Sequence, residues 1–184
     1  MMKKIEIKNF SIKFIDIMIG IVLGLGFQWW EGLREPWQYV AFIFVYLDVT
    51  DYWIDYGPTL KKWPPKKEID VFLDLAFCFA LFLYIYSTQT LVIYFIMAFG
   101  LIKILDFLWL YSSKLEYHPT NFYKKYIDTW MITNVVEIAL SAFILLIAAM
   151  TNLSSFTILI TFIVMRVATR IIASYNYKKV YLPN

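Results

Sequence analysis

Carboxylates recur inside the apolar part of this sequence at spacings that would let several of them bind one ligand together. Asp48, Asp51 and Asp55 follow one another at intervals of three and four residues, so on a helix they lie on one face. Asp70 and Asp74 repeat the interval of four after a short loop. Clustered carboxylates can bind a divalent metal ion that in turn holds a diphosphate. One hypothesis is therefore a magnesium-dependent transferase that acts on a lipid diphosphate within a membrane.

The spacing of Asp48, Asp51 and Asp55 resembles the D-x-x-D-x-x-x-D motif of the intramembrane prenyltransferases. Members of that family are much longer, and they carry a second such motif in a separate half that this chain lacks. The asparagine that usually precedes their first aspartate is Leu47 here. The transferase therefore stays an alternative, with the three aspartates as its metal-holding residues.

Ionisable side chains occur in every apolar run, and Glu137 lies near the middle of its own run. Charges at membrane depth are costly, so they should face the interior of a helix bundle or water and pair with one another. They could form structural ion pairs, line a hydrated vestibule that concentrates cations, or do both. The charged cluster in question comprises Asp48, Asp51, Asp55, Asp70, Lys103, Asp106, Arg166 and Arg170.

Most other site chemistry is excluded by composition. His118 is the only histidine and stands beside Pro119, which leaves no histidine pair for haem and no His/Cys metal site. Cys78 is the only cysteine, so no intrachain disulfide can form. The sequence has no glycine-rich phosphate loop, no G-x-S-x-G motif and no T-V-G-Y-G filter. We therefore predict no cofactor.

Composition places the chain among integral membrane proteins. Hydrophobic residues make up 61%, aromatic residues 20% and charged residues only 17%, and the mean hydropathy is +0.62. The 184 residues leave room for about six spanning helices of roughly 20 residues and no separate soluble domain, so residues 1–184 should form a single six-helix transmembrane domain. A net charge of +3 is too small to indicate nucleic acid.

Six apolar runs are predicted to be helices, because a lipid-exposed segment must satisfy its own backbone hydrogen bonds. Pro58, Pro64 and Pro65 are predicted to separate the second helix from the third. The runs are Ile12 to Trp30, Trp37 to Tyr56, Ile69 to Tyr86, Leu91 to Tyr111, Tyr126 to Ala149 and Leu153 to Ser174.

Lysines are concentrated in every second connection between these runs. Lysines precede the first run and follow the second, the fourth and the sixth. The other three connections together hold only one basic residue, Arg34. Basic residues concentrate in cytoplasmic loops, so both termini should be cytoplasmic.

The first run has two distinct helical strips. Ile21, Leu25 and Gln28 lie in one line at 3.6 residues per turn, and Gly20 and Gly24 form a small-residue strip beside them. Such a helix can pack closely on neighbours while it presents a narrow apolar line to a shared axis. We interpret it as the lining of an ion pathway.

The first three runs resemble the transmembrane protein 175 family of endolysosomal potassium channels, which has short six-helix prokaryotic relatives. That family carries F-S-D on its first helix, with an isoleucine five residues after the aspartate. Phe14, Ile15 and Asp16 occupy the motif here, Ile21 takes the place of that isoleucine, and Leu25 that of a second pore-facing leucine.

The resemblance continues into the next two runs. The family's second helix ends near Y-W, as Tyr52 and Trp53 do here, and its helix-three asparagine and L-x-F run correspond to Asp74 and the residues after it. The family's second-helix histidine falls at Tyr56, and its motif serine is Ile15.

The resemblance implies a homotetramer in the cell membrane of a prokaryote, conducting monovalent cations. Ile21 would form the narrowest apolar ring, through which a weakly hydrated potassium ion passes more readily than sodium. Trp53, Tyr56 and Asp74 would form the network that holds the pore helix through Asp16. The partners implied are membrane lipids and further copies of the chain.

We therefore predict an all-α, six-span membrane protein that acts as a passive potassium-selective channel subunit. The transferase is one alternative. Another is a non-conducting subunit of a larger membrane complex, whose charges assemble it with partner chains.

Overall fold

The computed structural model describes the backbone of residues 2–176 and the side chains of residues 15–67, 69–120 and 123–175. Within this part the chain is all-helical and has no strand. Its elements are α1 (Met2–Phe27), η1 (Gln28–Gly32), α2 (Pro36–Lys62), α3 (Glu68–Tyr86), η2 (Ser87–Gln89), α4 (Val92–Tyr117), α5 (Asn121–Met150) and α6 (Ser155–Asn176).

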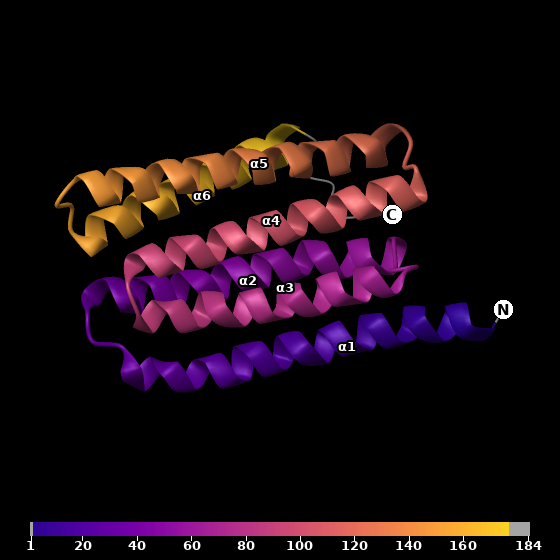
Figure 1. The fold of residues 1–184 in the computed structure, drawn as a ribbon, viewed down its shortest axis with the longest axis horizontal. Coiled ribbons are helices and arrows are strands. Elements are labelled where there is room, and N and C mark those ends of the chain that lie inside the picture. The colour runs from indigo at the N-terminus through magenta and orange to yellow at the C-terminus, as the bar shows by residue number, and fades with distance from the viewer. Residues whose placement is uncertain (1, 177–184) are drawn as a thin grey trace.

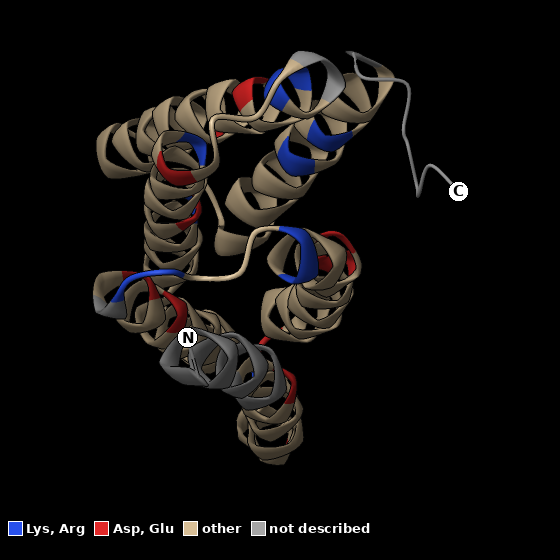
Figure 2. Ribbon diagram, turned by 90° about the vertical axis from the view of Figure 1, so that its right-hand side faces the viewer, with Lys and Arg blue, Asp and Glu red and all other residues tan. Residues whose placement is uncertain are grey.

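The long helices lie side by side along one axis, with α1 at one edge of the bundle (Figure 1). α4 packs on both α3 and α5, whereas α1 packs mainly on α3. Short connections reverse the chain each time, so α6 ends where α1 begins. Figure 2 looks at this end of the bundle, where acidic and basic residues lie on several helices.

Among the residues that the structure describes, four helices are long and apolar enough to cross a membrane, as expected of an all-α membrane protein. These segments are Ile69–Gln89, Val92–Tyr117, Tyr123–Met150 and Ser155–Tyr175. The first two predicted runs are also helical, as α1 and α2, and α2 is a continuous helix although aspartates interrupt its apolar sequence.

The predicted break after the second run begins later than expected. Pro58 lies inside α2, which continues to Lys62, so the prediction that Pro58 helps to end this helix is wrong. A proline removes only one backbone donor, and the helix resumes beyond it when its other carbonyls find partners. The helix then runs to its last turn, where the Trp63 backbone N–H donates to the Thr59 carbonyl at 2.9 Å. Pro64 and Pro65 then separate α2 from α3.

His118 ends α4 in the left-handed region, at φ 45°. Its backbone N–H donates to the Lys114 carbonyl at 3.2 Å, which satisfies one of the last carbonyls of the helix. The single histidine is thus a helix cap.

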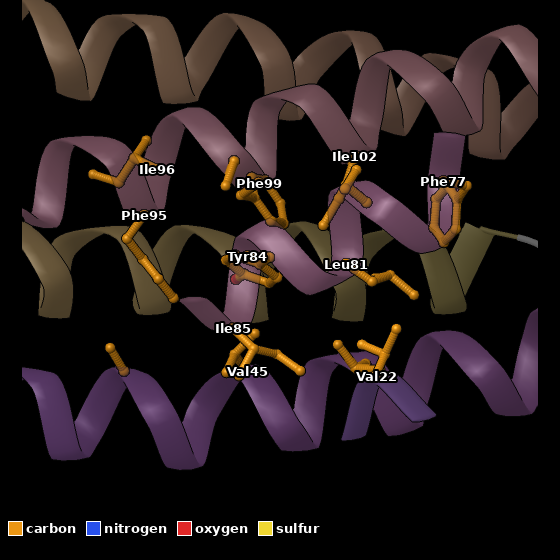
Figure 3. Packing of buried hydrophobic residues seen from close by; sticks show 14 of the residues in the cluster. Val22, Val45, Phe77, Leu81, Tyr84, Ile85, Phe95, Ile96, Phe99 and Ile102 are labelled. Carbon is orange, nitrogen blue, oxygen red and sulfur yellow. The ribbon is translucent and has the colours of Figure 1, made fainter. Parts of the chain in front are cut away.

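Aromatic rings fill the bundle interior toward the end opposite the termini. Tyr84 on α3 contacts Phe95 and Phe99 on α4, with ring centroids 4.7 and 5.9 Å apart, and Phe162 on α6 packs on both phenylalanines. Each of these four side chains is at most 1% exposed. Figure 3 shows α3 side chains, among them Leu81 and Tyr84, lying between α4 and the two helices α1 and α2.

The close approach of α1 to its neighbours occurs at Gly26. A Cβ atom there would lie 2.9 Å from Ile85 and 3.1 Å from the Tyr46 hydroxyl, whereas Gly20 and Gly24 have no neighbouring atom within 4 Å. The small-residue strip predicted from the sequence is therefore open in the single chain. Gly26, which that prediction did not include, allows the contact instead.

This difference predicts opposite effects for two alanine substitutions. Gly26→Ala should lower the free energy of unfolding by about 1 to 3 kcal/mol, because the new methyl group overpacks against Ile85. In the monomeric chain, Gly24→Ala should be neutral or stabilising by up to about 1 kcal/mol, because alanine is the better helix former and meets no atom of the same chain. Thermal unfolding of both variants in detergent measures this, and equal effects would contradict the packing described.

Candidate functional site

Charged side chains from four helices meet inside the bundle. α2 contributes three aspartates at successive turns, α4 contributes a lysine and an aspartate, α5 a glutamate, and α6 two arginines one turn apart. We call this set the charged network. It comprises Asp48, Asp51, Asp55, Lys103, Asp106, Glu137, Arg166 and Arg170.

Arg166 connects three helices. Its Nε donates to Asp48 Oδ1 on α2 at 2.9 Å, and its Nη1 donates to Glu137 Oε1 on α5 at 2.7 Å. Arg166 is 4% exposed. A buried guanidinium in two charge-assisted hydrogen bonds holds its partners in fixed directions, so α2 and α5 are tied to α6 at this level.

Glu137 lies between two cationic side chains. Its Oε2 is 3.1 Å from the Lys103 ammonium on α4, its Oε1 accepts from Arg166, and the residue has no exposed surface. Thr169 on α6 adds a further hydrogen bond to Oε1. The carboxylate is thus compensated by two cations and a hydroxyl, which is what allows a charge at this depth.

Arg170 repeats the arrangement one turn further along α6. Its Nε is 2.7 Å from Asp51 Oδ2, and its Nη2 pairs with Asp55. Its guanidinium carbon also lies 4.7 Å from the Trp130 ring centroid. The three α2 aspartates are therefore all bonded to arginines of α6.

Asp106 is held by neutral donors. The Tyr52 hydroxyl donates to its Oδ1 at 3.2 Å, and Asn134 Nδ2 donates to its Oδ2 at 2.7 Å. Tyr52 stacks on Tyr56, whose hydroxyl donates to Asp74 at 2.6 Å. These bonds link α2 to α3, α4 and α5.

A cavity of about 40 Å³ lies against the network, between α2, α4, α5 and α6. Such a volume holds about three water molecules. Its polar wall includes Asp51, Asp55, Lys103, Asp106, Arg166 and Arg170. The ion pairs match one of the two interpretations offered for the charged cluster, whereas the hydrated vestibule stays a prediction.

Asp70 lies outside the charged network. It is buried, and it accepts hydrogen bonds from the Ser112 hydroxyl at 2.7 Å and the Lys67 backbone at 3.2 Å. It thereby joins α3 to α4 and ends the loop before α3. Of the eight residues in the predicted cluster, the other seven belong to the network.

The predicted pore face lies on the side of α1 turned away from α3. Ile21 is 45% exposed, Leu25 is 46% exposed, and Gln28 is exposed as well. Ile17, one turn before Ile21 and 62% exposed, lies on the same face. Sequence reasoning did not include Ile17, although its spacing of four from Ile21 could have found it.

The motif residues do not all come together in the single chain. The side chain of Phe14 lies outside the described residues, Ile15 is buried, and Asp16 is exposed. Among the described side chains, none is hydrogen-bonded to Asp16, so its expected contact with Trp53 and Asp74 is not formed within one chain.

Sequence reasoning also missed polar residues that complete the network. Asn134 and Thr169 carry no charge, so a search for ionisable groups overlooked both. The signal was present on α5, where Asn134, Glu137 and Ser141 recur at three and four residues and are all buried. A polar stripe in an apolar helix indicates the bundle interior.

No family model, no curated protein and no solved structure matches this chain. The resemblance to the transmembrane protein 175 family therefore stays a prediction from the motif residues.

Two isosteric substitutions should separate the two kinds of carboxyl group in the network. Glu137→Gln leaves Lys103 without its paired carboxylate and leaves Arg166 with Asp48 alone, and removal of one partner from a buried pair costs about 3 to 5 kcal/mol. Asp106→Asn should cost under about 1 kcal/mol, because the new amide oxygen can still accept from Asn134 while the amide NH2 donates to the Tyr52 hydroxyl, which can also act as an acceptor.

Chemical unfolding in detergent micelles provides the measurement for both variants. Equal destabilisation by Asp106→Asn and Glu137→Gln would show that the network does not depend on the Glu137 contacts in the way described.

Proposed function

We propose that the chain spans a membrane six times with both termini in the cytoplasm. The four long apolar helices support this, and α1 and α2 run beside them with 26 and 27 residues. At 1.5 Å per residue each is about 40 Å long, enough for a hydrocarbon core of about 30 Å. The lysine-bearing connections lie at the end where α1 begins, which by the distribution of basic residues is cytoplasmic.

We further propose that the protein is the subunit of a passive, potassium-selective cation channel whose pore is lined by α1. The observation that carries this proposal is the division of α1 into two faces. Ile15, Ile19 and Val22 are buried in the bundle, while the row of Ile21, Leu25 and Gln28 is exposed. A peripheral helix anchored on one side can present its other side to the same helix of further copies.

The path for ions is placed between copies because the interior of one chain is filled. Tyr84, Phe95, Phe99 and Phe162 occupy the bundle centre and are at most 1% exposed. Gly20 and Gly24 have free space beside them, so another α1 can approach closely there. By the family resemblance the assembly has four copies.

Selectivity in this proposal comes from dehydration. A ring of Ile21 side chains offers no oxygen to replace the hydration shell of an ion, so an ion that holds water weakly passes more readily. Potassium holds its water less strongly than sodium. The charged network then acts as the framework that fixes the helices behind α1.

The channel is favoured over both alternatives by how the charges are used. Asp48, Asp51 and Asp55 are each bonded to an arginine, which leaves them poorly disposed to hold magnesium for a transferase. Among the side chains described, no three His, Cys, Asp or Glu groups are placed to hold a metal ion. Lys103, Arg166 and Arg170 are paired within the chain, so they are not left to recruit a partner subunit.

A flux experiment with one matched control tests the channel. The protein is reconstituted in liposomes, and the uptake of potassium and of sodium is measured separately. We expect potassium uptake by the unchanged protein, and we expect Ile21→Asn to raise sodium uptake relative to potassium, because the amide hydrates the constriction. Ile43→Asn on α2 introduces the same change at an isoleucine that is 54% exposed, and it should leave the ratio unchanged.

Absence of potassium uptake would exclude the channel. If the ratio of sodium to potassium uptake changes equally in Ile21→Asn and Ile43→Asn, α1 does not line the pore. The same conclusion follows if neither substitution changes this ratio.

A further inference from the structure

Two grooves flank the outward side of α5. One lies between α5 and α6, measures about 390 Å³, and is lined by Lys125, Thr129, Ile132, Val136, Ile172 and Ala173 among others. The other lies between α4 and α5 and measures about 410 Å³. Both have a lysine at the end of the bundle where the basic loops lie, and apolar side chains further in. Neither groove contains a charged side chain of the network or a residue of the α1 face, although Thr169, which bonds Glu137, lines the groove between α5 and α6.

The two grooves differ in charge. In the α4–α5 groove, the Lys114 ammonium is 2.6 Å from Asp128 Oδ1, so its charge is neutralised within the groove. In the α5–α6 groove, Lys125 is exposed and forms no ion pair with any side chain that the structure describes. Only the α5–α6 groove therefore offers an uncompensated positive charge.

The rest of the α5–α6 groove is open and is lined by four apolar side chains together with Thr129, Thr133 and Thr169. Ile132 is 65% exposed and Ile172 is 60% exposed, while the small side chain of Ala173 is buried at 2%. Large side chains on the rims and a small one between them make a furrow along the helix axis. An occupant must be anionic at the basic end and apolar along the remainder.

We propose that the α5–α6 groove binds one anionic phospholipid, with the phosphate at Lys125 and an acyl chain along Ile132, Val136 and Ile172. Basic pockets between membrane helices near the cytoplasmic surface suit such headgroups. The positive charge lies nearer the cytoplasmic surface and the apolar furrow lies deeper, which matches the headgroup and the acyl chains of a phospholipid in the inner leaflet. The inference depends on the six-span placement proposed above and is independent of ion conduction.

The test compares lipids and matched variants of the whole protein in detergent. Native mass spectrometry counts the dioleoylphosphatidylglycerol or dioleoylphosphatidylcholine molecules retained per chain at equal lipid concentration. The unchanged protein should retain phosphatidylglycerol about fivefold more strongly, as expected for one lysine near a lipid phosphate. Lys125→Gln should remove this preference. Lys124→Gln, which removes an equal charge next to the groove, should keep it.

A second pair of variants tests the furrow without changing charge. Thr129→Phe fills the groove beside Lys125 and should reduce phosphatidylglycerol retention, whereas Val135→Phe lies in the α4–α5 groove and should not. Equal losses for Lys124→Gln and Lys125→Gln would mean that the basic surface as a whole attracts the lipid. That outcome, no preference in the unchanged protein, or retention unaffected by Thr129→Phe would overturn the proposal. Ion flux is not part of the readout, so a failed channel assignment stays distinguishable.

Discussion

The fold depends on the compensation of one buried carboxylate. Glu137 has no exposed surface, and its two oxygens lie against Arg166 and Lys103. In a low-dielectric interior a lone charge is far more costly than a lone apolar contact is favourable, so α4, α5 and α6 can pack only where these three groups meet. Arg166 extends the same requirement to α2 through Asp48, 118 residues away in sequence.

The network also divides the bundle into two functional halves. Toward the end where α1 begins, the interior consists of ion pairs and a small polar cavity. Toward the opposite end it consists of Tyr84, Phe95, Phe99 and Phe162, with Phe162 packed edge to face on both phenylalanines. The cavity in the polar half has room for a few water molecules, whereas buried rings fill the aromatic half. The proposed ion pathway therefore has to lie outside this interior.

The sequence predicted which segments are helices and which groups form ion pairs better than it predicted which residues contact each other. Apolar runs marked all six helices, and the cost of a charge in lipid predicted that Lys103, Arg166 and Arg170 would pair with carboxylates. Spacing along one helix cannot tell which other helix is adjacent, so it did not predict that Arg166 selects Asp48 and Glu137. For the same reason Gly26 was missed, because a close approach depends on Ile85 across the interface. The prediction at Pro58 was wrong because it assigned a helix end from the residue type alone, and α2 continues through this proline.

Asp16 bears on whether the exposed face of α1 meets lipid or water. Exposed apolar side chains such as Ile21 do not require a protein partner in a membrane, because lipid tails are as apolar as they are. A carboxylate is different, since its exposure to hydrocarbon costs about 2.5 to 3.5 kcal/mol near the bilayer centre and less toward the surface. Asp16 lies in the apolar run of α1, is exposed, and has no bonded partner among the described side chains. A second copy or water beside α1 removes that cost, which lipid alone does not.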